Sequence, residues 1–198
     1  MLELNRQEDC YNLSQSGESS MNENTRHPLV GIVCGSVSDL DALKPTIQTL
    51  EELEIPYTLD VKSAHRLPDE MRNYAKTAED KGYKAIIACA GGAVDLSGMI
   101  AAYTLVPVIG LPVKTSALGG IDSLYSMVQM PEGIPVGTMG IDRGKNAALF
   151  AAEILGTSNE KIKERLRSFR ESMASRVRED AQNEISKIRK DMETKYLA

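Results

Sequence analysis

The chain has 198 residues, with 23 Lys and Arg against 28 Asp and Glu, a formal net charge of -5 and 42% hydrophobic residues. This length suits one ordinary domain with tails, and the composition is typical of a globular protein. The acidic charge and the 5% of aromatic residues argue against a nucleic-acid binder, which uses basic patches and exposed rings. No apolar run reaches the roughly 18–20 residues of a membrane span, and the N-terminus does not resemble a secretory signal.

The cysteines and histidines are few. Cys10, Cys34 and Cys89 stand without metal-ligand spacing, which is typical of a reducing cytosol and argues against a disulfide framework. The histidines are His27 and His65, so a zinc site built from them is not expected. We therefore expect a cytoplasmic protein without a bound metal.

Residues 1–27 are polar and show no apolar period. This composition predicts a disordered N-terminal extension. Met21 lies inside it, shortly before the first predicted strand. The segment is either a docking tail or an extension upstream of an alternative start at Met21, and the composition favours the second interpretation.

Residues 28–156 alternate between strand and helix signals. Apolar runs predict buried strands at 29–34, 56–61, 84–90, 107–111 and 134–139. Helical spacing of apolar residues, or favourable first-turn residues, predicts helices from 38 onward and at 68–81, 94–103 and 146–155. This alternation predicts an α/β protein with a three-layer α/β/α, doubly wound parallel sheet of flavodoxin-like type.

Residues 157–198 are predicted to form one long charged helix. Its apolar residues, beginning with Ile162, Leu166, Phe169 and Met173, recur every three or four positions. Such a stripe needs a packing partner, and two interpretations are open. It either contacts a neighbouring subunit, because the preceding domain already covers its sheet, or packs along its own domain with frayed last turns.

The loop at 35–39 follows the first predicted strand. In open α/β sheets the ligand crevice lies at this carboxyl edge. The loop offers a glycine, the hydroxyl groups of Ser36 and Ser38, and the start of a helix, which favours an anion. It resembles a phosphate cradle but lacks the ending of a Walker loop. Asp39 is interpreted either as a helix cap or as a ligand of sugar hydroxyls.

The loop at 63–68 follows the second predicted strand and contains Ser63, His65 and Arg66. Arg is suited to binding phosphate, and His moves protons near neutral pH. His65 is the only histidine of the predicted domain. If the site uses an imidazole, it therefore uses that of His65.

The loop at 91–99 follows the third predicted strand and begins with Gly91 and Gly92. Paired glycines either let the backbone approach a ligand closely or form a tight turn. Three such loops on consecutive strands of one sheet favour a site for a phosphorylated small molecule.

These motifs, in this order, resemble the PurE (AIR carboxylase) family of purine biosynthesis, and most closely its class I form. The resemblance covers about residues 29–156 and rests on the segments 35–39, 63–68, 90–93, 122–131 and 146–149. It implies N5-carboxyaminoimidazole ribonucleotide mutase activity. In that reaction the N-carboxylate leaves as carbon dioxide, stays trapped, and recombines at C4 of the imidazole.

The same resemblance assigns roles within the site. His65 is implied to be the catalytic histidine that moves protons between the steps, without metal, ATP or organic cofactor. Phosphate is expected on the serine and arginine side, and ribose at Asp39. A homo-oligomer, an octamer, is also implied, with the sites at subunit boundaries. The implied substrate-binding residues are Ser36, Ser38, Asp39, Ser63, Arg66, Gly91, Gly92 and Ala93.

One loop departs from the class I pattern, because Asp95 stands in place of its histidine and Ser97 in place of its proline. An ionised Asp95 would repel a substrate carboxylate, whereas a protonated one would donate a hydrogen bond as the histidine does. Three hypotheses remain: the mutase, a carboxylase or decarboxylase of a similar imidazole nucleotide, and a nucleotide-binding paralogue without catalysis. The presence of His65 argues against the third.

Overall fold

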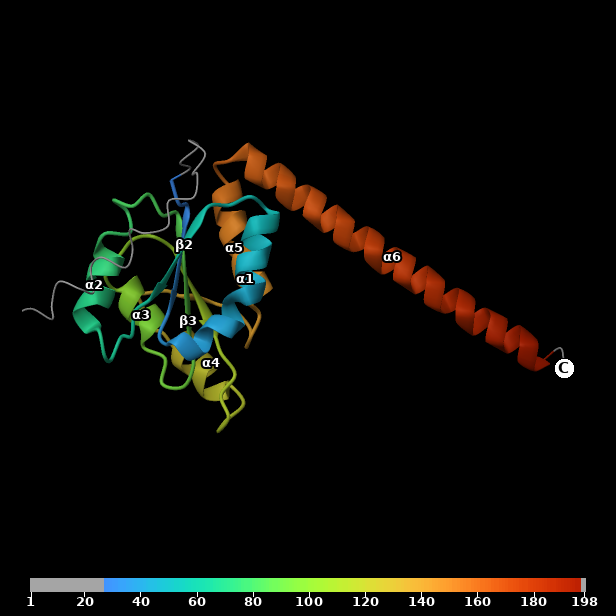
Figure 1. The fold of residues 1–198 in the computed structure, drawn as a ribbon, viewed down its shortest axis with the longest axis horizontal. Helices are drawn as coiled ribbons and strands as arrows, with labels where there is room; N and C mark the ends of the chain where they lie inside the picture. Colours follow the sequence, from blue (N-terminus) through green and yellow to red (C-terminus); the bar gives the residue numbers. More distant parts are fainter. Residues whose placement is uncertain (1–26, 197–198) are drawn as a thin grey trace, which may run out of the picture.

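The computed structural model describes residues 27–196 and contains a five-stranded parallel sheet with helices on both faces (Figure 1). Its strands pair in the order β2-β1-β3-β4-β5, which is the flavodoxin-like order. The predicted fold class is therefore confirmed. The extension predicted for residues 1–27 lies outside the described residues except for His27. The strands are β1 (Val30–Cys34), β2 (Tyr57–Val61), β3 (Ala85–Ala90), β4 (Val108–Pro112) and β5 (Gly137–Thr138).

The three central strands are apolar on both faces. Every residue of β1, β3 and β4 is buried, whereas β2 and β5 form the partly exposed edges. Gly31 in β1 shows how tight this packing is, because a Cβ there would lie 2.4 Å from the Tyr74 hydroxyl and 2.7 Å from the Tyr83 ring. Only glycine fits at this point of the sheet.

Two helical layers enclose the sheet and form two cores. The helices α1 (Leu40–Glu52) and α5 (Gly144–Gly156) cover one face, where Leu43 and Ala148 share a core with Ile32 of β1. The other face is covered by α2 (Pro68–Lys76), α3 (Leu96–Ala101) and α4 (Ile121–Val128). A short 3-10 helix, η1 (Val37–Asp39), leads into α1. This arrangement leaves the carboxyl ends of the strands open between the layers.

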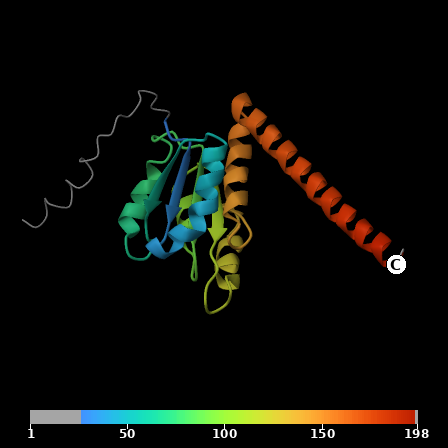
Figure 2. The same ribbon diagram turned by 45° about the vertical axis from the view of Figure 1, so that its right-hand side comes forward.

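The long C-terminal helix is present as predicted and forms α6 (Glu160–Tyr196). Its first turns pack on the domain, because Ile162, Leu166 and Phe169 are buried in the α1 and α5 core. The remainder extends away from the domain (Figures 1 and 2). The first part of the apolar stripe thus packs on its own domain. The distal apolar side chains of the stripe are exposed: Met173, Val177, Ile185, Ile188 and Met192.

The predicted helix at 94–103 is shorter in the structure, where α3 spans Leu96–Ala101, and three other elements differ more. The helix predicted at 68–81 ends at Lys76, and the Thr77 hydroxyl donates to the Asn73 carbonyl (2.9 Å) at this end. Turns follow up to Gly82, which has a φ of 84°. The strand predicted at 134–139 is reduced to the two residues of β5, because the sheet ends there. The helix α4 was not predicted.

Candidate active site

A hollow of about 350 Å³ opens at the carboxyl edge of the sheet. It lies where the strand order reverses between β1 and β3, the usual ligand crevice of a doubly wound sheet. The loops after β1, β2 and β3 all line it. These loops bring together every site residue expected from the sequence except Gly92: Ser36, Ser38, Asp39, Ser63, His65, Arg66, Gly91, Ala93 and Asp95.

The loop after β1 is held by its own serines. Ser36 Oγ accepts hydrogen bonds from the Ser38 backbone N–H (3.4 Å) and the Ser38 hydroxyl (3.0 Å), so Ser36 caps η1. Asp39 stands at the start of α1, but its side chain makes no capping hydrogen bond there. The residue is only 9% exposed and lines the hollow. The structure therefore does not support a capping role for Asp39.

Burial also changes the acidity of Asp39. Desolvation raises the pKa of this carboxyl group above its ordinary value, although contacts with the Ser36 backbone and the Ser38 side chain oppose the shift. A carboxyl group whose pKa is raised by folding makes the folded state lose stability as the pH rises through the raised pKa. The ionised Asp39 therefore costs stability at neutral pH, which is a common feature of functional sites.

We accordingly expect Asp39→Asn to raise the stability of the ligand-free protein at neutral pH. The amide has no charge to desolvate, so the urea midpoint should increase, and the gain should disappear in acid, where Asp39 itself is protonated. Urea unfolding across a pH series measures this. Asp41→Asn is the matched control, because Asp41 is an exposed carboxylate paired with Lys44 (2.7 Å). An unchanged or lower midpoint at neutral pH for Asp39→Asn would contradict the expectation.

The loop after β2 positions a guanidinium. Ser63 Oγ accepts hydrogen bonds from the Arg66 backbone N–H (3.2 Å) and from Arg66 Nε (3.4 Å). The Nη groups of Arg66 donate to no other residue in the described part of the chain. Arg66 lines the hollow, and its free Nη groups are donors suited to a phosphate.

His65 and Asp95 meet across the hollow. The Nε2 atom of His65 lies 2.8 Å from Oδ2 of Asp95, which joins the loop after β2 to the loop after β3. Both side chains are 62% exposed in this chain. The same two residues line a second hollow of about 390 Å³, whose other walls are largely apolar and include Met99 and Met130. The pair therefore stands between a polar hollow and an apolar one.

The loop after β3 is held from behind by α4. The Gly92 backbone N–H donates to Ser123 Oγ (2.9 Å), and the Ser123 hydroxyl donates to the Val113 carbonyl (2.8 Å). Ser126 Oγ lies 3.4 Å from the Gly92 carbonyl. Since Gly92 also has a φ of 79°, the structure gives it a role in the turn. The contacts of these serines were not expected from the sequence. The one signal for them is the four-residue spacing of Ser123 and Met127, which share the buried face of α4.

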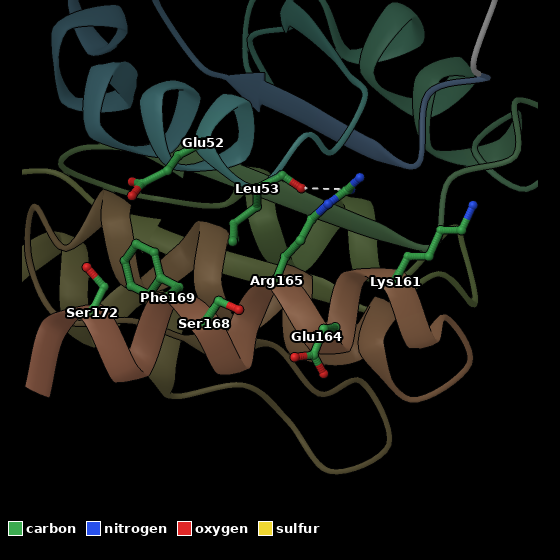
Figure 3. A pocket seen from close by; sticks show the side chains of 8 residues that line it. All are labelled: Glu52, Leu53, Lys161, Glu164, Arg165, Ser168, Phe169 and Ser172. Carbon is green, nitrogen blue, oxygen red and sulfur yellow. Dashed lines mark hydrogen bonds between the residues drawn. The ribbon is translucent and has the colours of Figure 1, made fainter.

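A larger groove of about 540 Å³ lies between the end of α1 and the first turns of α6 (Figure 3). Arg165 crosses it, donating to the Leu53 carbonyl (3.1 Å) and pairing with Glu54 (2.6 Å). Phe169 of α6 is buried beside it. These contacts anchor α6 to the domain, and the groove lies apart from the loops that hold His65 and Arg66.

The described cysteines, Cys34 and Cys89, are both buried. Burial raises the pKa of the Cys34 thiol to about 11 and also raises that of Cys89. Both are therefore thiols at neutral pH and poor nucleophiles. Within residues 27–196, no group of three or more His, Cys, Asp or Glu side chains is placed to hold a metal ion. No helix in the same range has both the length and the apolar character needed to cross a membrane.

Known proteins are similar to this chain in sequence and in fold. The AIR carboxylase family matches residues 29–176. The chain is 54% identical over 146 residues to the N5-carboxyaminoimidazole ribonucleotide mutase of Pyrococcus abyssi. This match covers 74% of this chain and 84% of that protein. It is 51% identical over 145 residues to the mutase of the same name from Escherichia coli, covering 72% of this chain and 86% of that protein.

A solved structure gives the same result for the fold. The crystal structure of Treponema denticola PurE matches with a TM-score of 0.72 and 30% sequence identity, over 79% of this chain and 98% of that chain. The family match spans the sheet, its covering helices and the first turns of α6. The chain therefore belongs to the AIR carboxylase family.

Proposed function

We propose that this protein converts N5-carboxyaminoimidazole ribonucleotide into 4-carboxy-5-aminoimidazole ribonucleotide, a step of purine biosynthesis. The observation that carries the proposal is the convergence of one imidazole, one guanidinium and one buried carboxylate, those of His65, Arg66 and Asp39, on a single hollow. Relatives named for this mutase reaction match most of their own length at about half identity, which supports the same chemistry here.

The binding roles follow from the chemistry of the three loops. The phosphate of the nucleotide binds beside Ser36, Ser38 and Arg66, since hydroxyl, guanidinium and helix-start N–H groups are donors that favour an anion. Ser63 holds Arg66 in place for this. Asp39 accepts hydrogen bonds from the ribose hydroxyls. A neutral diol is suited to a carboxylate that burial has already separated from water.

The backbone after β3 completes the pocket for the base. Gly91 and Ala93 line the hollow with little side-chain volume, which lets the imidazole ring lie close to the main chain. Ser123 and Ser126 of α4 fix this stretch through Gly92. The aminoimidazole ring would thus lie between the loop after β3 and His65.

The reaction moves one carboxyl group and one proton. The bond between the carboxyl carbon and the substrate nitrogen breaks, its electron pair stays on nitrogen, and protonated His65 supplies a proton there. The carbon dioxide released then accepts the electrons of C4, forming the new carbon–carbon bond. C4 finally loses its proton to the neutral imidazole, which returns His65 to its starting state. The sum is an isomerisation that needs no further reactant.

We also propose that the working enzyme is a homo-oligomer. On α4, the apolar side chains of Ile121, Tyr125 and Val128 face outward, while the buried face carries Ser123 and Met127. Exposed apolar surface of this kind typically marks an interface. The distal stripe of α6 offers a second such surface, and a second copy of the chain is the partner expected for both.

We expect a chain that ends at Ser172 to form a smaller or weaker assembly. This variant keeps Ile162, Leu166 and Phe169, which belong to the domain core, and removes the exposed stripe from Met173 onward. Sedimentation velocity over a concentration series measures the change, and circular dichroism checks that the domain is folded. An assembly of unchanged size and stability would show that the distal part of α6 is not an interface.

The proposed reaction is tested by giving the purified protein two alternative substrates. One sample receives N5-carboxyaminoimidazole ribonucleotide, and the other receives aminoimidazole ribonucleotide with bicarbonate. Formation of the C4-carboxylated product from the first alone is expected. Formation from the second alone would favour the direct carboxylase, and tight nucleotide binding without product would favour a paralogue with another substrate.

A further inference from the structure

The carboxylate of Asp95 contacts an imidazole instead of a helix end. Asp95 occupies the N-cap position of α3, where a carboxylate usually accepts a hydrogen bond from the first turn, yet its side chain makes no capping bond. Its Oδ2 atom lies 2.8 Å from Nε2 of His65, within the range of a charge-assisted hydrogen bond. The two residues are 30 positions apart and belong to different crossover loops.

The geometry points to Asp95 as a positioning residue that holds His65 by its Nε2–H group and leaves Nδ1 to exchange protons with the substrate. An ionised carboxylate can only accept hydrogen bonds, so the hydrogen in this contact comes from Nε2. In a neutral imidazole only one nitrogen carries hydrogen, so the lone pair is then on Nδ1. This inference rests on the proposed function only for the identity of the reaction, since the contact exists in the free protein.

The pairing suits each half of the proposed proton transfer. When His65 carries the extra proton, both ring nitrogens bear hydrogen and the negative charge of Asp95 lies against the cation. When Nδ1 has given its proton to the substrate nitrogen, the ring keeps its Nε2–H bond to Asp95 and does not turn. The Nδ1 lone pair is then ready to take the proton from C4, so no proton is gained or lost over the cycle.

An aspartate in place of the histidine of the class I pattern suits this positioning role. A histidine at position 95 would accept a hydrogen bond from the Nε2–H group of His65 only when it is neutral and in one of its two tautomers. An ionised carboxylate always accepts hydrogen bonds, and either of its two oxygens can do so. Asp95 thus supplies a permanent acceptor for His65. It contacts the ring at Nε2, so that Nδ1 is left for the substrate.

The ring nitrogens of His65 give a direct test in the absence of substrate. The chain has two histidines, so 15N-labelled protein carrying His27→Asn yields a single imidazole signal set in long-range 1H–15N spectra. With the imidazole neutral, we expect one tautomer with hydrogen on Nε2. In Asp95→Ala the Nδ1–H tautomer should become populated, and the two nitrogen shifts should move toward each other. Identical shifts with and without Asp95 would overturn the inference.

Kinetics test the same contact in the working protein. We expect Asp95→Ala, which removes the acceptor, to lower kcat roughly 10- to 100-fold, because a proton carrier that is misoriented loses its reaction geometry. KM should stay within about threefold, since the phosphate and ribose contacts are intact. Asp69→Ala is the matched control, because Asp69 is an exposed carboxylate that pairs with Arg72 and lines neither hollow. A rise in KM with unchanged kcat would overturn the inference and make Asp95 a substrate contact.

The two readouts separate this inference from the proposed function. If the wild-type protein does not convert the N5-carboxylated nucleotide, the mutase proposal fails, and the tautomer measurement still decides the role of Asp95. If the protein turns over and the tautomer of His65 is independent of Asp95, the mutase proposal stands and the positioning role is wrong.

Discussion

Replacing His65 with asparagine is expected to lower kcat about 100-fold or more while KM changes by less than about threefold. Asparagine keeps a planar polar group of similar reach but cannot carry a proton. His65 is the only imidazole that lines the hollow, so the described chain offers no second histidine to replace it. Steady-state turnover of N5-carboxyaminoimidazole ribonucleotide, together with calorimetric binding of the product, measures both effects.

The second histidine of the chain supplies the control. His27 lies at the opposite end of the sheet from the catalytic loops, near Leu29 and Pro56. His27→Asn is therefore expected to have wild-type kinetics. If His65→Asn also turned over at the wild-type rate, the proton-transfer mechanism proposed here would be wrong.

Replacing Arg66 with alanine is expected to weaken nucleotide binding by about 1.5–3 kcal/mol, the scale of a hydrogen bond to a charged group. This corresponds to a roughly 10- to 150-fold increase in Kd. The reason is that Arg66 lines the hollow and its guanidinium is held by Ser63. Calorimetry with the nucleotide product measures the change, and the loss should be smaller for the corresponding nucleoside, which has no phosphate to bind.

Arg72 is the matched control for this variant. It lies on α2, pairs with Asp69 and lines neither of the two hollows. Arg72→Ala should leave Kd within about twofold, because exposed ion pairs contribute little. Equal weakening by Arg66→Ala and Arg72→Ala would mean that overall charge, and not a specific phosphate contact, governs binding.

The sheet was predictable because its central strands are short apolar runs. In β1 and β3 every side chain is buried, so no polar residue interrupts the run. The helix α4 escaped prediction for the opposite reason. Its apolar residues Ile121, Tyr125 and Val128 are exposed, and its buried face carries Ser123. It begins after Gly120, whose φ of 93° gives no capping signal in the sequence.

The site was predictable in its parts but not in its contacts. The motifs after β1, β2 and β3 had to meet at one edge, because parallel strands place their carboxyl ends together. The contact between His65 and Asp95 depends on where two crossover loops come to rest, which local patterns do not encode. The absence of a capping bond at Asp39 likewise depends on η1, which turns the chain before α1 begins.

In the proposed reaction one carboxyl group moves within the site and is not exchanged with solution. A substrate that carries 13C in its N5-carboxylate tests this retention when the medium contains an excess of unlabelled bicarbonate. A hollow that holds the carbon dioxide until C4 captures it predicts that the product keeps the label in its C4 carboxylate. A product whose label is diluted to the level of the bicarbonate pool would contradict the mutase and assign the reaction to a carboxylase.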